Sequence, residues 1–201
     1  MSTIRAFRCV AFALAAMLGL SSAAIAQQSP PAKQAKPGPR SAPAVAPQAA
    51  VGGGQPTLIG QFGDWGAYAA SNGGKKVCYA LAKPASQTTQ PPNRPRDPAY
   101  VFISTRPAEN VRNEISIVIG YPFKPGSEAA VDIGAANYVM YTQADGAWIK
   151  NAAEEARMVE SMKKGADAVV KGESGRGTKT TDTFSLKGLE QALTRIAQEC
   201  K

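Results

Sequence analysis

Alternating hydrophobic and polar positions run through most of the chain after residue 57 and predict β-strands. "NEISIVIGY" (113–121) is the clearest case, because Ile115, Ile117 and Ile119 fall on one face of an extended chain. Runs rich in β-branched and aromatic residues predict further strands, which are "GDWGAYAA" (63–70), "KKVCYALA" (75–82), "AYVFISTR" (99–106), "ANYVMYTQ" (136–143), "GAWIK" (146–150), "ADAVVKGE" (166–173) and "TKTTDTFSL" (178–186). Asn72-Gly73 and Asp145-Gly146 predict hairpin turns. The pattern indicates a mainly β domain.

Two helices and one loop interrupt this pattern. A helix is expected after Asn151, which can cap it, and its end is expected at Gly165. A closing helix is expected from a cap at Ser185, because the apolar residues then recur at helical spacing, namely Leu186, Leu189, Leu193, Ile196 and Cys200. The proline-rich "KPASQTTQPPNRPRDP" (83–98) predicts a surface loop that cannot pair in a sheet.

The first 26 residues have the three parts of a secretory signal peptide. Arg5 and Arg8 precede the uncharged run "CVAFALAAMLGL" (9–20), and Ala24 and Ala26 supply small residues for cleavage before Gln27. The alternative, a retained membrane helix, needs about 20 apolar residues, and this run is shorter. We therefore expect an exported chain with no transmembrane segment after cleavage, in the periplasm, associated with the outer membrane, or secreted.

Residues 27–56 predict a spacer, and residues 57–201 predict one domain. The spacer consists mostly of Pro, Ala, Gln and Gly and has no apolar periodicity, so we expect it to be extended and disordered. Of the 23 basic residues, two lie in the leader and three in the spacer, so the domain carries 18 basic and 15 acidic residues. The small excess and the absence of a dense basic stripe argue against a nucleic-acid partner. The basic spacer either is simply solvated or contacts anionic envelope polymers.

The cysteine count predicts a cross-link. Cys9 would leave with the leader, and Cys78 and Cys200 would remain as an even pair in an exported protein. Cys200 lies on the inward face of the closing helix, and Cys78 shares a strand face with Ala80 and Ala82. These positions are compatible with a Cys78–Cys200 disulfide, and buried free thiols are the alternative.

The sequence lacks the residues that several kinds of catalysis and metal binding require. The chain contains no histidine, which removes Ser-His-Asp and Cys-His catalysis and imidazole metal sites. Glu154, Glu155 and Glu160 lie among basic residues on the first helix and favour a solvated, ion-paired face. "GESGRGTKT" (172–180) resembles a phosphate-binding loop, but its lysine comes one residue late, so a hairpin turn is expected. We therefore expect no catalytic residue, no metal site and no cofactor.

Aromatic residues are the best candidates for contact with a partner. Trp65 and Trp148 each lie beside a predicted hairpin and would either line a sugar- or peptide-binding surface or fill the core. Tyr121 and Phe123 lie in the Pro/Gly segment "GYPFKPGS" (120–127), and loop aromatics often contact partners. Trp65, Tyr121 and Phe123 are the candidate partner-contact residues.

Several of these motifs together resemble the invasion associated locus B family of exported bacterial envelope proteins. They are "FGDW" with its hairpin into "KKVCYAL", then "ISIVIGYPF", and the closing "DTFSLKGLEQAL". The resemblance spans about residues 57–200 and implies an immunoglobulin-like β-sandwich with one or two peripheral helices, including a C-terminal one. It implies no enzymatic activity and no catalytic residues. Many relatives carry further cysteines after the Asp-Gly hairpin, where "NAAEEARMVESM" has none, so the Cys78–Cys200 pair rests on the cysteine count.

The sequence thus predicts a non-enzymatic envelope module that binds an envelope or host protein or a glycan. One alternative is an enzyme that acts on an envelope polymer through carboxylates brought together from separate strands. Another is a carrier of a small ligand, which would need a hollow apolar interior.

Overall fold

The structure, a computed structural model, describes residues 55–201. The predicted signal peptide, its cleavage site and nearly all of the predicted spacer lie outside the described residues. The strands follow in chain order: β1 (Thr57–Phe62), β2 (Trp65–Asn72), β3 (Lys75–Ala82), β4 (Ser86–Gln90), β5 (Tyr100–Arg106), β6 (Val111–Val118), β7 (Glu128–Ile133), β8 (Ala136–Gln143), β9 (Gly146–Trp148), β10 (Asp167–Glu173) and β11 (Lys179–Ser185). The helices are η2 (Pro107–Glu109), α1 (Ala152–Lys164) and α2 (Leu189–Glu199).

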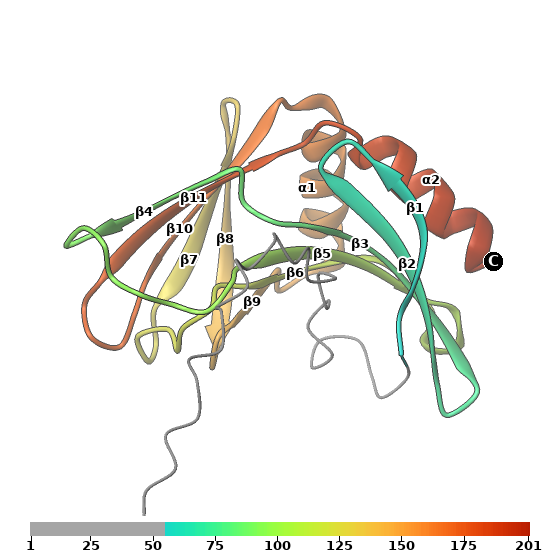
Figure 1. The fold of residues 1–201 in the computed structure, drawn as a ribbon, viewed down its shortest axis with the longest axis horizontal. Helices are drawn as coiled ribbons and strands as arrows, with labels where there is room; N and C mark the ends of the chain where they lie inside the picture. The colour runs from blue at the N-terminus through green and yellow to red at the C-terminus, as the bar shows by residue number, and fades with distance from the viewer. Residues whose placement is uncertain (1–54) are drawn as a thin grey trace, which may run out of the picture. The chain divides into compact units, whose positions relative to one another are not determined.

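The strands form one continuous antiparallel sheet in the order β1-β2-β3-β5-β6-β9-β8-β7-β10-β11-β4. Figure 1 shows α1 and α2 next to each other on one side of this sheet. Helix α2 contacts β1, β2, β3 and β5, and α1 contacts β6. The prediction of a mainly β, sandwich-like domain with a C-terminal helix is confirmed, and its strands belong to one connected sheet.

The face of the sheet that packs against the helices is the inner face, and the opposite one is the outer face. Ile115, Ile117 and Ile119 are buried on the inner face, as their alternation predicted. The main core lies on this side and takes side chains from both helices and from strands across the sheet, for example Leu193 of α2 and Val170 of β10. Burying this apolar surface is the principal driving force for folding.

The predicted hairpins form, but their turns are shifted by one residue. Asn72 pairs with Lys75, so the first turn consists of Gly73 and Gly74, both with positive φ, at 56° and 80°. Gln143 pairs with Gly146, which puts Ala144, with φ of 52°, and Asp145 in the second turn. Two adjacent glycines adopt the left-handed region more readily than the pair Asn-Gly, which explains the first shift.

The proline-rich segment 83–98 is only partly a loop, which corrects the prediction from its composition. Residues Ser86–Gln90 form β4, which pairs with β11 from Lys179 to Thr183. This strand lies at an edge of the sheet, where only one side must pair and a proline can follow directly. The polar stretch between Pro84 and Pro91 is therefore a strand, and the rest of the segment connects it to β5.

The first helix agrees with its prediction, and the second begins later than expected. Asn151 caps α1 by accepting a hydrogen bond from the Glu154 amide at 2.8 Å, and Gly165 follows its end. Ser185 is still paired with Asp167 in the sheet, so it does not cap α2. Instead α2 begins after Gly188, whose φ is 94°.

Cys78 and Cys200 form a disulfide, as the cysteine count predicted, with their Cα atoms 6.0 Å apart. The bond joins β3 to the residue that follows α2, and both cysteines are buried in the main core. An early strand is thereby linked covalently to the end of the chain. No helix within residues 55–201 is long and apolar enough to cross a membrane.

Candidate interaction surface

Trp65 lies in the core with no exposed surface. Its indole Nε1 donates a hydrogen bond to the Ser185 carbonyl at 3.0 Å, which joins β2 to the end of β11. The partner-contact role predicted for Trp65 requires an exposed ring, and this ring is covered. In this structure Trp65 fills the core, the alternative that the sequence left open.

Tyr121 and Phe123 pack into the sheet instead of projecting from their loop. Phe123 is 5% exposed, and its amide donates to the Ala144 carbonyl at 2.8 Å. The Tyr121 hydroxyl is 2.7 Å from the Thr180 hydroxyl, and burial raises the pKa of Tyr121. The two rings meet edge to face, with centroids 5.5 Å apart. Only Tyr121 keeps partial exposure, so this pair offers little surface to a partner.

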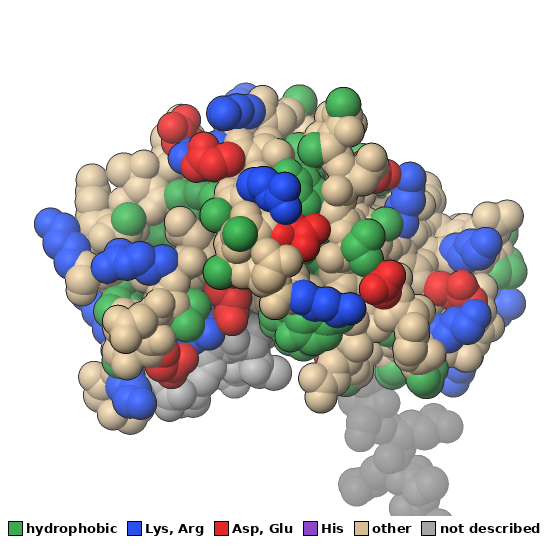
Figure 2. Space-filling view, turned by 180° about the vertical axis from the view of Figure 1, so that it is seen from behind, with side chains coloured by type: hydrophobic (Ala, Val, Ile, Leu, Met, Phe, Trp, Pro, Cys, Tyr) green, Lys and Arg blue, Asp and Glu red, His purple; other side chains and the backbone are tan. Residues whose placement is uncertain are grey.

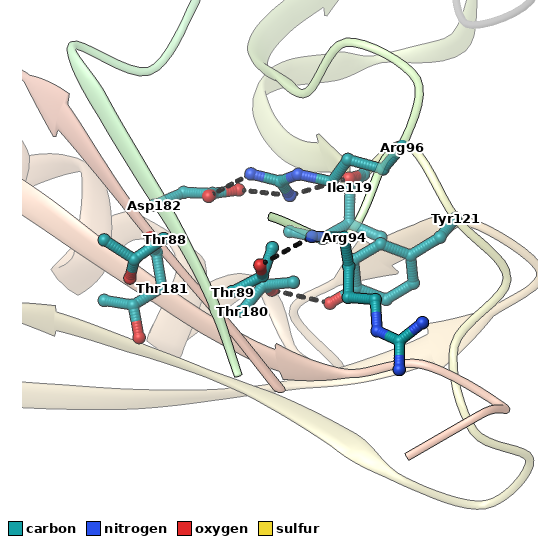
Figure 3. Close-up of polar contacts among 9 residues, drawn as sticks. All are labelled: Thr88, Thr89, Arg94, Arg96, Ile119, Tyr121, Thr180, Thr181 and Asp182. Atoms are coloured by element: carbon teal, nitrogen blue, oxygen red, sulfur yellow. Dashed lines mark hydrogen bonds and ion pairs between the residues drawn. The ribbon is translucent and has the colours of Figure 1, made fainter. Parts of the chain in front are cut away.

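A buried ion pair beside Tyr121 fixes the connection between β4 and β5. Arg96 donates through Nη1 to Asp182 Oδ2 at 2.8 Å and through Nη2 to Oδ1, and Nη1 also donates to the Ile119 carbonyl at 3.0 Å. Figure 3 shows the Arg96 guanidinium directed at Asp182, whereas the Arg94 side chain points away from the pair. Burial raises the pKa of Asp182, and the hydrogen bonds from Arg96 oppose that shift.

The backbone around this ion pair is also closely packed. The Asp97 amide donates to the Gly120 carbonyl at 3.0 Å. Gly120 has φ of 81°, and a Cβ there would strike the Asp97 carbonyl oxygen. Because Arg96 and Asp182 are joined by two hydrogen bonds and closely enclosed, this cluster acts as a structural clamp.

The outer face carries an aromatic row, a set of five side chains, three of them aromatic, that strand pairing brings together. Residues directly opposite each other in neighbouring strands project to the same face. One such row crosses five strands and comprises Leu81, Phe102, Ser116, Trp148 and Tyr141. The Tyr141 and Trp148 rings lie with centroids 5.7 Å apart and an interplanar angle of 30°. Beside the Leu81–Phe102 end of the row, Tyr68 stacks on Tyr79 at 5.2 Å, and Tyr79 meets Phe102 at 5.7 Å.

The two ends of this row differ in exposure. Tyr79 and Phe102 have no exposed surface. Burial, and to a lesser extent the nearby Tyr68, raises the pKa of Tyr79 far above the ordinary tyrosine value. At the β8–β9 end, Tyr141 is 37% exposed, Val139 is 49% exposed and Trp148 is partly exposed. We call Val139, Tyr141 and Trp148 the exposed aromatic patch.

Two ion pairs flank the exposed aromatic patch. Glu128, the strand partner of Tyr141, pairs with Lys150 at 3.7 Å. Lys171 pairs with Asp132 at 2.8 Å, and its hydrogen bond lowers the pKa of that carboxyl. An apolar centre with a polar rim is the usual arrangement of a protein interaction surface. Figure 2 shows acidic and basic side chains interspersed on the face that it views.

Sequence reasoning considered Trp148 as a binding residue but missed Val139 and Tyr141. The signal was in "ANYVMYTQ", where both alternating sets contain large apolar residues. Tyr138 and Met140 point into the core. If the outer face of β8 were only solvated, the alternating positions 139 and 141 would be expected to carry polar residues, but they carry Val139 and Tyr141. The pairing of Tyr141 with Trp148 adds a second aromatic ring at the same place, and only the hairpin register reveals it.

Carboxylates and metal ligands form no comparable centre. Within residues 55–201, no group of three or more Cys, Asp or Glu side chains is placed to hold a metal ion. Glu155 is half-buried and accepts a hydrogen bond from the Ile115 amide at 2.7 Å, and burial raises the pKa of this carboxyl. Glu154 and Glu160 bond to Asn151 and Lys163 at the helix surface. Glu155 thus anchors α1 to β6.

Comparison with known families matches residues 65–197 to the model described as invasion associated locus B (IalB) protein. The chain belongs to the IalB family. The match runs from Trp65 in β2 into α2 and covers the aromatic row, the clamp and Cys78, and it confirms the resemblance noted from the sequence. At the level of the family, this IalB chain is an invasion-associated envelope protein. A search of curated proteins and a search of solved structures each found no match.

Proposed function

We propose that this IalB protein is an exported, non-enzymatic interaction module of the cell envelope. In this proposal it binds an envelope or host protein or a glycan through the exposed aromatic patch. The predicted signal peptide supports export, and membership of the IalB family supports an envelope role. The observation that carries the proposal is the Tyr141–Trp148 pair, which lies on the outer face together with the exposed Val139.

The energetics of such a patch fit a binding role. A solvated sheet face would present polar side chains, because exposed apolar surface costs free energy in water. Tyr and Trp are the residues most enriched at binding hot spots, since their rings bury much apolar area while their polar atoms bond at the edge. The flanking ion pairs of Lys150 and Lys171 would limit access of water to the bound centre.

Binding to fractionated envelope tests this proposal and separates the two kinds of partner. Purified protein is immobilised and exposed to envelope fractions that are untreated, protease-treated or periodate-oxidised. A protein partner is lost after protease, and a glycan partner is lost after periodate. Tyr141→Ser should weaken binding about 30-fold, the effect of losing one hot-spot residue worth about 2 kcal/mol.

The control is Leu58→Ser, which removes an apolar side chain in β1 that is more exposed than Tyr141, at 51% against 37%, and should leave binding unchanged. Equal binding by Tyr141→Ser and the unaltered protein would contradict the proposed surface. Specific binding lost in both variants would contradict its location at the β8–β9 end.

A further inference from the structure

We propose that the open edge of β4 binds an extended acidic peptide segment of a partner protein, which adds to the sheet as one more strand. This edge is separate from the exposed aromatic patch. Strands β8 and β4 are four strand spacings apart in the sheet order, about 19 Å. The inference therefore does not depend on the proposed binding role of Tyr141 and Trp148.

The first observation is that β4 ends the sheet. Within residues 55–201, β4 pairs with β11 on one side and with no strand on the other. Figure 1 shows it at the margin of the sheet, beside β11. Four of its five residues are exposed, and Thr89 is partly exposed. The strand is therefore accessible along its whole length.

The pairing with β11 indicates which backbone groups of β4 face this open edge. The Thr183 carbonyl accepts a hydrogen bond from the Ala85 amide at 2.7 Å, so the Thr183 backbone faces β4. Ser86 is the strand partner of Thr183. Because opposed residues of antiparallel strands face each other in alternate pairs, Ser86 faces β11 in turn. The alternate residues Gln87 and Thr89 therefore direct their N–H and C=O groups to the open edge.

These free groups make β4 a template for a further strand. Unpaired N–H and C=O groups along an edge strand readily pair with another extended chain. Lysine, proline or a bulge within the edge strand would oppose such pairing. The strand "SQTTQ" contains neither lysine nor proline, and its register with β11 is continuous from Ser86 to Gln90. It has none of these three protections.

The opposite edge of the sheet, formed by β1, is protected. The register of β1 with β2 shifts between Leu58 and Gly60. Helix α2 contacts β1, and Arg195 Nε donates a hydrogen bond to the Ile59 carbonyl at 3.3 Å. An irregular register and a covering helix are two common ways of closing an edge. The contrast with β1 indicates that strand addition is open at β4.

Basic side chains at the Gln90 end of β4 indicate the charge of the incoming peptide. Lys179 is the strand partner of Gln90, and the Arg94 amide donates to the Thr89 hydroxyl at 3.1 Å. Figure 3 shows the Arg94 side chain directed away from the buried ion pair. Arg94 and Lys179 are exposed, and neither forms an ion pair among residues 55–201. Carboxylates of an acidic peptide would supply their missing partners.

The same charges disfavour a second copy of the chain as the occupant. Antiparallel pairing of two β4 strands would place the Ser86 end of each copy, which follows the exposed Lys83, beside the basic Gln90 end of the other. Like charges brought close together oppose association. An extended peptide that carries Asp or Glu has the complementary charge, and its backbone groups recur at the spacing of a strand.

Fluorescence polarisation with synthetic peptides tests the site on the chain without residues 1–26. The probe is a fluorescein-labelled heptapeptide in which threonine and glutamate alternate. One control peptide carries lysine in place of glutamate. A second control keeps glutamate but is N-methylated at every backbone amide, so it keeps its charge and cannot donate to a strand. We expect only the unmodified glutamate peptide to bind.

A proline at Gln87 tests the backbone contact. Gln87→Pro removes one outward N–H and leaves the hydrogen bonds to β11 in place, so it should weaken binding of the glutamate peptide about tenfold. The matched control Gln87→Thr keeps the N–H and should bind as tightly as the unaltered protein. Tyr141→Ser should also leave binding unchanged, which separates this site from the exposed aromatic patch.

The charge contribution has its own pair of variants. Arg94→Gln/Lys179→Gln should weaken binding of the glutamate peptide about fivefold, the effect of losing two exposed ion pairs. The control Lys75→Gln/Arg112→Gln removes two exposed cations from β3 and β6 and should leave binding unchanged. Both variants lose the same net charge, so a difference between them reports on position.

Amide hydrogen exchange, followed by NMR on the unaltered protein, gives a measurement that needs no variant. Exchange at Gln87 and Thr89 should be fast without peptide and should slow about tenfold when the glutamate peptide is near saturation. The Thr88 amide, which faces β11, should be protected with or without peptide. This measurement decides the matter if Gln87→Pro fails to fold.

Three results would overturn the inference. The first is an absence of binding by the glutamate peptide. The second is equal binding by the N-methylated peptide or by the lysine peptide, which would leave no role for strand pairing or for charge. The third is protection of Gln87 and Thr89 without peptide that disappears on dilution, which would assign the edge to a second copy of the chain.

Discussion

Arg96 and Asp182, which are 86 positions apart in the chain, form a buried ion pair that fastens the β4–β5 connection to β11. The Asp182 side chain has no exposed surface, and that of Arg96 is 9% exposed. Because neither charge can return to water while the fold persists, each depends on the other. The pair holds a proline-rich segment that makes few other long-range contacts through its side chains.

Removing one member of this pair should be strongly destabilising. Asp182→Asn leaves the buried guanidinium without its counter-charge and should lower the free energy of unfolding by about 3–5 kcal/mol, measured by urea denaturation. The double variant Arg96→Met/Asp182→Leu removes both charges and should recover most of this loss. Lys124→Ala, which breaks the exposed pair with Glu173, should cost less than about 1 kcal/mol. An Asp182→Asn effect as small as that of Lys124→Ala would contradict the account of the clamp.

The disulfide should contribute a large part of the stability. It closes a loop of 122 positions, for which the chain-entropy model gives about 4–5 kcal/mol. Reduction, or the double variant Cys78→Ala/Cys200→Ala, should lower the urea midpoint accordingly. Thiol titration of the unfolded, unreduced chain without residues 1–26 should detect no free thiol. Two free thiols would contradict the bond.

Glu155 should make stability fall as pH rises through the carboxylate range. Burial raises its pKa in the folded state above that of the unfolded chain, so the folded state holds the proton more tightly. The free energy of unfolding therefore decreases as pH rises from the ordinary glutamate pKa through the folded value. Glu155→Gln cannot ionise and its amide oxygen can still accept from the Ile115 amide, so this variant should gain stability relative to the unaltered protein over that interval.

Glu160, on the same helix, should make stability change with pH in the opposite direction. The hydrogen bond from Lys163 lowers the pKa of this exposed carboxyl, so its small contribution is present above the unfolded pKa and is lost as pH falls. Glu160→Gln should thus lose a little stability at neutral pH and none in acid. Parallel pH profiles for the two variants, obtained by thermal unfolding, would contradict this assignment.

Local patterns predicted much of the fold because their causes are local. The buried face of β6 follows from the alternation of Ile115, Ile117 and Ile119, and α1 follows from a capping asparagine and a terminal glycine. The predicted start of α2 was wrong, because pairing of Ser185 with Asp167 extends β11 through the residue expected to cap the helix. A tertiary contact overrode a good local signal there.

The candidate surface was harder to predict because it depends on distant strands. Tyr141 and Trp148 meet through a hairpin register, and Arg96 meets Asp182 only because β4 adds to the edge of the sheet beside β11. No composition rule gives such pairings, since polar edge strands such as "SQTTQ" have no hydrophobic alternation. The burial of Trp65 was one of two interpretations that the sequence left open.

The most direct test of the binding surface is site-specific cross-linking in cells that export the protein. A photo-reactive amino acid replaces Gln143, which is exposed at the end of β8 next to Tyr141, and captured material is identified by mass spectrometry. We expect capture of one reproducible envelope or host component, at least about tenfold weaker when Tyr141→Ser is added and undiminished with Leu58→Ser. Capture of nothing specific, or capture that Tyr141→Ser leaves unchanged, would contradict a binding role for this patch.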